Sequence, residues 1–121
     1  MTVGLLIKDH QEDLHEFIIN HIGMTSGESI DVCELTNLTI CNLSSDNLSS
    51  DFDESLIEGD RAIKKRTYTR RLTSELSSKW VRMGLQELQI RLLIKKFIPF
   101  LVSVIMYKLE EYRFEREEVY H

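Results

Sequence analysis

The sequence predicts an all-α fold, or one nearly so: a small helical bundle in which a long basic helix precedes an apolar C-terminal helix. Apolar residues recur at intervals of three and four over much of the chain, which is the spacing of one helix face. A single proline and five glycines in 121 residues are too few for the many turns of an all-β protein. The apolar content of 42% and the charged content of 29% are typical of one globular domain, which we expect to cover residues 1–121.

Residues 9–23 carry the clearest helical pattern. Asp9 and Glu12 have the spacing of a capping box, in which side chains satisfy exposed N–H groups at a helix start. An apolar stripe follows at helical spacing, formed by Leu14, Phe17, Ile18, His21 and Ile22. Gly23 is the expected end of the helix. Because His21 falls within the stripe, we expect it to be a core histidine.

The next segment, residues 24–51, is ambiguous. The apolar residues from Ile30 to Leu43 fit neither strict alternation nor a helical stripe, so a short hairpin and a short helix both remain open. Residues 44–51 are rich in serine, asparagine and aspartate and predict a flexible acidic loop. Ser50 has the position of an N-cap for a short helix that ends near Lys65. Its inward-facing residues would be Phe52, Leu56 and Ile63.

From about Thr69 the helical pattern is continuous and contains two overlapping apolar stripes. Pro99 cannot donate a backbone hydrogen bond, so we expect a kink or a break just before it, with helices of about 69–97 and 99–117. Two stripes imply a helix that is covered on more than one side, in the core or at a subunit contact. The predicted partner interface consists of Trp80, Leu85, Leu88, Leu92, Ile94, Ile98, Leu101 and Ile105. Residues 110–121 are charged and predict a solvated tail.

Charge is strongly segregated along the chain. Residues 1–60 contain one basic and 13 acidic residues, whereas residues 61–96 contain 11 basic and two acidic residues. This asymmetry predicts either a segment that binds a polyanion or an acidic segment, around 46–60, that folds onto the basic one. Two solvated faces of opposite charge are the third alternative.

A dense basic cluster is the candidate nucleic-acid-binding segment, because cationic side chains neutralise phosphates and aromatic rings can stack on bases. Its residues are Arg61, Lys64, Lys65, Arg66, Tyr68, Arg70, Arg71, Lys79 and Arg82. Arg91 continues the segment, and Trp80 is a second candidate for stacking. The part from Lys64 to Arg71 is also typical of a nuclear import signal.

The sequence predicts neither an enzyme nor a metal or cofactor site. It contains no glycine-rich phosphate loop and no nucleophile motif. A catalytic thiol would have to combine Cys33 or Cys41 with His21, and we expect both cysteines to be small buried thiols instead. His10, His15 and His21 are five and six residues apart, whereas two ligands on one helix face need a spacing of three or four.

The longest apolar run, Phe97 to Tyr107, would rise only about 16 Å as a helix, roughly half of the hydrocarbon thickness of a membrane. No secretory signal is visible, so we expect an intracellular protein without membrane attachment. The predicted function is that of a non-catalytic adaptor or regulatory subunit, which assembles with itself or with a protein partner by helix packing. The alternative is a nucleic-acid-binding regulator that uses residues 61–91.

Overall fold

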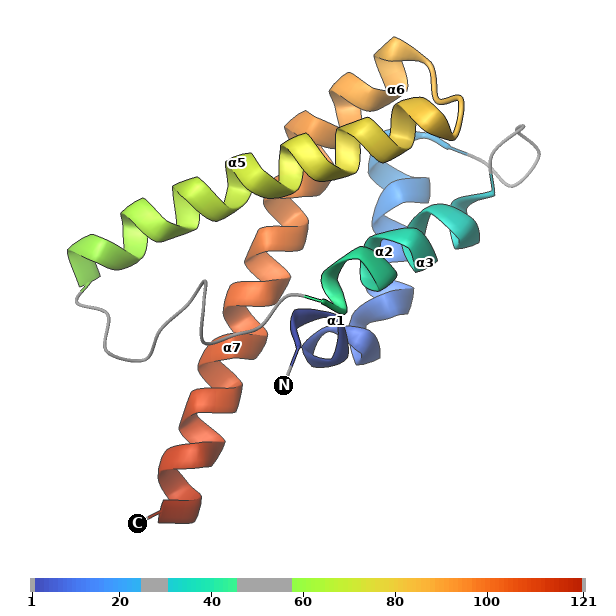
Figure 1. The fold of residues 1–121 in the computed structure, drawn as a ribbon. Helices are drawn as coiled ribbons and strands as arrows, with labels where there is room; N and C mark the ends of the chain where they lie inside the picture. The colour runs from blue at the N-terminus through green and yellow to red at the C-terminus, as the bar shows by residue number, and fades with distance from the viewer. Residues whose placement is uncertain (1, 25–30, 46–57, 121) are drawn as a thin grey trace.

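The computed structural model describes residues 2–24, 31–45 and 58–120, and all of the regular elements in these ranges are helices. The all-α prediction is therefore confirmed. Two long helices, α5 and α7, cross each other, and the shorter N-terminal helices lie on one side of this crossing (Figure 1). In chain order the elements are α1 (Val3–Leu6), η1 (Lys8–His10), α2 (Gln11–Phe17), η2 (Ile18–Ile22), α3 (Val32–Leu43), α5 (Glu58–Arg82), α6 (Glu87–Leu92), η3 (Leu93–Phe97) and α7 (Ile98–Tyr120).

The helix predicted over residues 9–23 is present as the successive elements η1, α2 and η2, and it ends at Gly23, whose φ is 79°. The predicted capping box is wrong, because α2 has no side-chain cap and the Asp9 carboxylate contacts Lys108 instead. The prediction for His21 is also wrong, since this residue is exposed. Ile18 and Ile22 of the same stripe are buried in η2, so His21 lies at the edge of the stripe, where its ring centroid is 4.6 Å from that of Phe17.

The ambiguous segment forms a helix, α3, and Asp31 explains where it begins. The Asp31 carboxylate accepts a hydrogen bond of 2.9 Å from the backbone N–H of Cys33, which caps the helix. Cys33 and Cys41 are both exposed, so the expectation of buried thiols is wrong. The predicted acidic loop beyond Ser45 and the predicted N-terminal part of the following helix, at 50–57, lie outside the described residues.

A glycine allows α1 to approach α3 closely. Gly4 is buried, and a Cβ atom at this position would lie 2.8 Å from the carbonyl oxygen of Ile40 and 2.7 Å from Oγ of Ser44. Real Cβ contacts are essentially never shorter than 3.0 Å. The absence of a side chain at Gly4 is therefore required by the packing of the two helices, rather than by the backbone conformation.

The long basic helix α5 differs from the predicted helix over 69–97 at both ends. It contains 25 residues, begins at Glu58 and ends at Arg82. The turn that follows contains Gly84, whose φ of 88° favours glycine and directs the chain into α6. The start of α5 extends away from the other helices (Figure 1), and Ile63 there is 61% exposed instead of facing inward.

Of the two alternatives predicted just before Pro99, a kink and a break, the break is wrong, because the chain stays helical from Glu87 to Tyr120. The geometry does change next to the proline, where the π-helical turn η3 (Leu93–Phe97) directly precedes α7. Proline has no N–H with which to continue the α-helical hydrogen bonds, and a π turn is one way to absorb this defect. The predicted charged tail is helical as far as Tyr120, and Tyr112 is half-buried.

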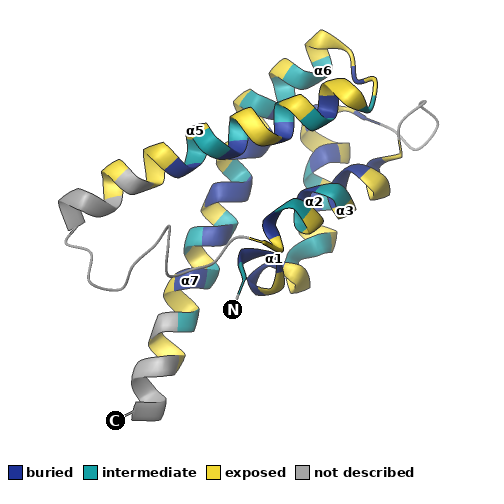
Figure 2. Ribbon diagram, in the orientation of Figure 1, coloured by how far each residue is buried: buried dark blue, intermediate teal, exposed yellow. Residues whose placement is uncertain are grey.

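The core lies where α5 crosses the C-terminal helix (Figure 2). Trp80 of α5 is fully buried, and its ring centroid lies 6.4 Å from that of Phe97. Apolar side chains of both helices surround this pair, including Leu72, Leu76, Leu101 and Ile105. Within the described part of the chain, no helix is long and apolar enough to cross a membrane.

Candidate functional site

Most of the predicted partner interface lies in the core of the chain itself. Trp80, Leu85, Ile98, Leu101 and Ile105 are buried, and Leu92 and Ile94 are half-buried. Only Leu88, which is 68% exposed, is presented fully on the surface. Most of these apolar residues therefore already pack against other residues of the same molecule. Their role in a partner interface stays a prediction, and Leu88 is the residue among them that is exposed enough to contact a partner.

A different set of apolar residues is exposed on α7. Tyr107 is 66% exposed and Phe114 is 63% exposed. They lie seven and fourteen residues after Phe100, so the three aromatic residues share one helix face. Val104 lies on the same face, next to the half-buried Phe100. We call this set, Phe100, Val104, Tyr107 and Phe114, the α7 stripe. None of its residues belongs to the predicted partner interface, although the seven-residue spacing of the aromatic residues indicates one helix face.

The start of the α7 stripe continues into a groove between α2, η2 and α7. Phe17 of α2 stacks on Phe100, with the ring centroids 4.2 Å apart and the planes within 6°. Together with Val104, these half-buried rings line the groove, whereas the exposed carboxylates Asp13 and Glu16 line its edge. We call this site the α2–α7 groove. It has an aromatic surface and a negatively charged edge.

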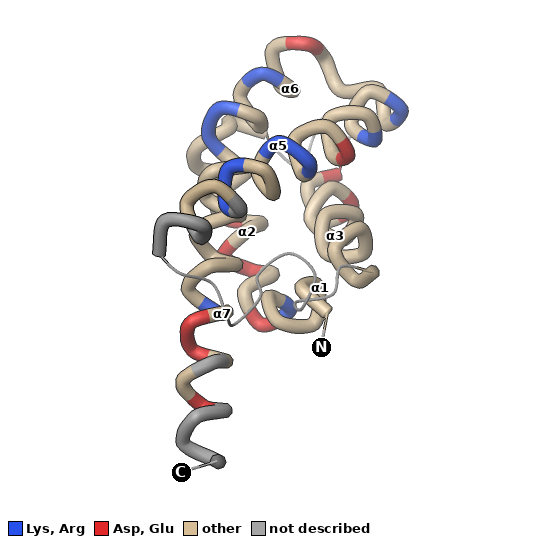
Figure 3. The backbone as a smooth tube through the Cα atoms, turned by 60° about the vertical axis from the view of Figure 1, so that its left-hand side comes forward, with Lys and Arg blue, Asp and Glu red and all other residues tan. Residues whose placement is uncertain are grey.

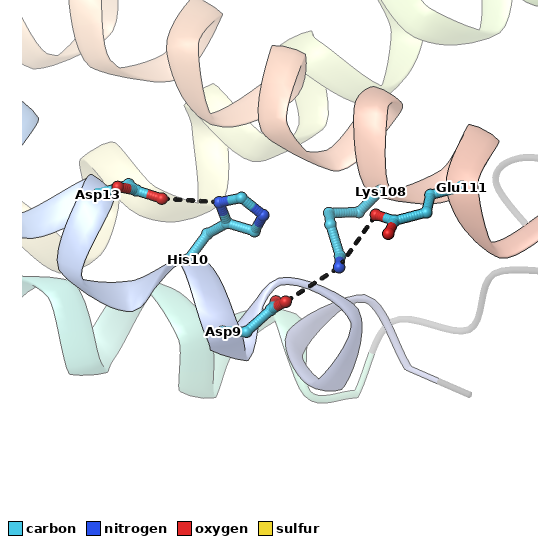
Figure 4. Close-up of polar contacts among 5 residues, drawn as sticks. All are labelled: Asp9, His10, Asp13, Lys108 and Glu111. Carbon is cyan, nitrogen blue, oxygen red and sulfur yellow. Dashed lines mark hydrogen bonds and ion pairs between the residues drawn. The ribbon is translucent and has the colours of Figure 1, made fainter.

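One ionic cluster connects α7 with the N-terminal helices (Figure 4). The Nζ atom of Lys108 lies 3.0 Å from a carboxylate oxygen of Asp9 and 3.2 Å from one of Glu111. The hydrogen bond from Lys108 holds the pKa of Asp9 below its ordinary value, and the same bond raises the pKa of Lys108. His10 and Asp13 form a separate contact of 2.8 Å, at the edge of the α2–α7 groove. The Lys108 cluster holds α7 against η1 near the start of its exposed aromatic part.

The predicted basic segment lies along α5. Its exposed cations are Lys65, Arg66, Arg70 and Arg82, and Arg71 and Lys79 are half-buried; we call these six residues the basic strip. Figure 3 shows Lys and Arg residues at intervals along α5 and on the helix that follows it. The side chains of Arg61 and Lys64 lie outside the described part of the chain. Arg91 is exposed and forms an ion pair of 2.6 Å with Glu87.

The aromatic residues predicted to stack on bases are not on the surface. Tyr68 is 2% exposed and Trp80 is 0% exposed. Tyr68 instead contributes the face of its ring to Arg71, whose guanidinium carbon lies 5.0 Å from the ring centroid. In this structure the basic strip therefore offers cations alone, without an exposed aromatic residue from the predicted set.

The C-terminal part of the basic strip lines a polar groove between α3 and α5. Arg71, Lys79 and Arg82 lie there together with the hydroxyl groups of Ser74 and Ser78. A carboxylate is also present, because Glu75 lies 3.6 Å from Arg71 and accepts a hydrogen bond from Asn42. This groove brings three cations of the strip together, and it could hold a phosphate group.

Neither cysteine lies next to the histidine considered as its base. Cys33 contacts His15 instead, with Sγ 3.7 Å from Nδ1. Both residues are accessible, on α3 and α2 respectively. Among the described residues, no three His, Cys, Asp or Glu side chains are grouped so that they could hold a metal ion.

Comparison of the chain with protein-family models, with curated proteins and with solved structures finds no match. Its function therefore has to be inferred from the surfaces described above. Three of them have a distinct chemistry: the aromatic α7 stripe, the acidic-edged α2–α7 groove and the cationic strip of α5.

Proposed function

We propose that this protein is a non-catalytic assembly protein, an adaptor or regulatory subunit, which binds its partner through a helix surface. The observation that carries the proposal is the α7 stripe. Tyr107 and Phe114 are each more than 60% exposed on a helix whose opposite face is buried in the core. Large exposed aromatic side chains are typical of interaction sites, and aromatic residues contribute a large share of the binding energy at protein interfaces.

The structure also gives the stripe a fixed position. The first half of α7 is held by its core residues, and Lys108 holds the helix to Asp9 close to Tyr107. The following part projects beyond the short N-terminal helices (Figure 1). A rigid helix that presents aromatic side chains loses little conformational entropy on binding, because the backbone is already ordered.

The experiment compares the mass of three chains in solution, by light scattering or sedimentation over the micromolar range. The wild-type chain should have a mass above that of the monomer, and Tyr107→Ser combined with Phe114→Ser should reduce it. Val81→Ser is the matched control, because Val81 is 63% exposed but lies on α5. A wild-type chain that stays monomeric throughout would contradict self-assembly, and equal loss in the control would show that the stripe has no special role.

The second candidate function is binding of a polyanion, nucleic acid above all, by the basic strip. The observation that favours it is that Lys65, Arg66 and Arg70 are exposed on one helix and form no ion pair with any described residue. Cations in such an array release counterions when they neutralise phosphates. The sequence from Lys64 to Arg71, which contains these three cations, could serve equally as a nuclear import signal. Localisation of a fluorescent fusion with and without the cations would test this.

Titration of a labelled single strand and a labelled duplex at low and high salt tests the second candidate. Replacing Lys65, Arg66 and Arg70 by alanine should weaken binding about equally for all sequences, because phosphate contacts carry no base information. It should also reduce the dependence of affinity on salt, by a log–log slope of roughly 0.7 to 0.9 for each phosphate that is no longer neutralised. The matched control is Lys95→Ala with Lys96→Ala, two exposed cations on η3. Flat titrations with the wild-type chain would exclude this function.

A further inference from the structure

The α2–α7 groove and the outer face of α5 have complementary chemistry. On α5, Ile63, Arg66 and Arg70 are all exposed at a spacing of three and four residues, so an aliphatic side chain lies beside two cations on one helix face. We call these three residues the α5 outer face. The groove has the opposite arrangement, with an aromatic surface from Phe17 and Phe100 beside two carboxylates.

Within the described part of one molecule, neither surface has a partner of opposite charge from a distant part of the chain. Arg66, Arg70 and Glu16 form no ion pair with any described residue, and Asp13 contacts only its near neighbour His10. The start of α5 extends away from the other helices (Figure 1), whereas the groove is formed by α2, η2 and α7. Because both surfaces belong to well-formed helices, one chain cannot bring its own α5 outer face into its own groove without unfolding.

We propose that the α2–α7 groove of one molecule binds the α5 outer face of a second copy. Ile63 would then contact Phe17 and Phe100, and Arg66 and Arg70 would face Asp13 and Glu16. This proposal rests on the assembly function proposed above, and it identifies the partner and the contact. The two surfaces are different, so the contact is heterologous, and each added copy leaves one groove and one outer face free.

The arrangement has two consequences that separate it from a contact made by the α7 stripe alone. Exposed charges at the edge of an interface are screened by salt, so association should weaken as ionic strength rises. A head-to-tail contact can also be completed by two defective chains, provided that each chain keeps the surface that is defective in the other. A contact between two identical stripes could not be restored in this way.

The test uses two charge-reversal variants of the full chain. The first is Asp13→Lys with Glu16→Lys, in the groove, and the second is Arg66→Glu with Arg70→Glu, on the α5 outer face. Each variant alone should associate about tenfold more weakly or worse, because like charges then face each other across the contact. An equimolar mixture should recover association, because the two variants can contact each other in two ways and both join opposite charges. The reversed groove meets the reversed outer face, or the unchanged groove meets the unchanged outer face. Recovery would also show that both variants are folded.

The controls reverse charges of the same sign elsewhere, all at exposed positions. Glu34→Lys on α3 reverses one carboxylate, and Lys95→Glu with Lys96→Glu on η3 reverses two cations. They should associate as the wild type does. The proposal is overturned if the wild-type chain is monomeric at low salt, if the controls lose as much as the variants, or if the mixture of two folded variants stays dissociated. If the mixture fails while Tyr107→Ser with Phe114→Ser still reduces the mass, this contact is wrong but the assembly function stands.

Discussion

The two halves of α7 contain similar side chains in opposite surroundings. Ile98, Leu101 and Ile105 in the first half are at most 1% exposed, whereas Tyr107 and Phe114 in the second half are more than 60% exposed. The difference comes from what each set of side chains faces: Ile98, Leu101 and Ile105 pack in the core with α5, whereas Tyr107 and Phe114 lie on a face of α7 that is exposed. Large apolar residues at helical spacing therefore show that a helix has an apolar face, but the neighbouring helices decide whether that face stabilises the fold or is free to bind.

The largest expected effect on stability comes from removing the buried side chain of Trp80 where α5 crosses α7. Trp80→Ala should lower the free energy of unfolding by about 3 to 5 kcal/mol, the cost typical of deleting a large buried side chain. Trp80→Phe should cost much less, because a ring still fills most of the site. The indole Nε1 of Trp80 also has no hydrogen-bond partner among the described residues, so the substitution by phenylalanine removes an unsatisfied buried donor. Urea unfolding followed by far-UV circular dichroism measures both; equal losses would show that the crossing does not depend on the filled volume.

The next effect is expected from the close contact between α1 and α3. Gly4→Ala places a Cβ atom 2.8 Å from the carbonyl oxygen of Ile40, a backbone atom that cannot rotate away. Overpacking of this kind typically costs about 1 to 3 kcal/mol. The neighbouring Leu5→Ala is the matched control, because Leu5 is 61% exposed and should change the free energy of unfolding little. If Gly4→Ala unfolds at the same urea concentration as the wild type, α1 does not dock on α3 as the structure describes.

The sequence predicts the helical class well because apolar periodicity is a local property of the chain. It also locates the helix over 9–23, since the stripe is clear and Gly23 ends it. The boundaries of the later helices fail where one residue overrides the pattern: Gly84 ends α5 inside a continuous stripe, and η3 lets the helix pass Pro99. Predicted exposure fails for Ile63, His21 and both cysteines, because the side of a helix that other helices cover depends on contacts between residues distant in sequence.

Removing the ionic cluster near the boundary of the two halves of α7 should have a smaller effect. Lys108→Met should cost less than about 1 kcal/mol at neutral pH, because Asp9 and Glu111 are well exposed to solvent and such pairs contribute little. Lys108→Arg is the control, since it keeps the charge. Chemical unfolding of the three chains in parallel measures the difference. A cost comparable with that of Trp80→Ala would mean that this exposed cluster stabilises the fold as strongly as the buried helix crossing does.

The dependence of that small difference on pH has a definite sign. The pKa of Asp9 is lower in the folded chain than its ordinary value of 3.8, so its contribution is present above this pH and is lost as the pH falls through the folded value. The pKa of Lys108 is raised, so its contribution is present below its ordinary value of 10.5 and is lost only as the pH rises through a higher value. The wild type and Lys108→Met should therefore converge in acid but differ at neutral pH. A difference that stays constant down to low pH would exclude the Asp9 contact as its cause.

The smallest expected effect on stability concerns the exposed half of α7, and it is the one that separates the two halves most sharply. Tyr107→Ser with Phe114→Ser should change the free energy of unfolding by no more than about 0.5 kcal/mol for each substitution, because exposed side chains away from caps and ion pairs contribute little. The slightly lower helix propensity of serine on this helix acts in the same small range.

Unfolding must be measured at the lowest workable protein concentration, where assembly contributes nothing to apparent stability. At higher concentration the wild type alone should gain stability, because association stabilises only the folded chain. A large loss at low concentration would mean that these two rings pack within one molecule, which would remove the basis for a free binding surface on α7. Unchanged stability at low concentration, together with the loss of that gain, would show that this half of α7 acts between molecules.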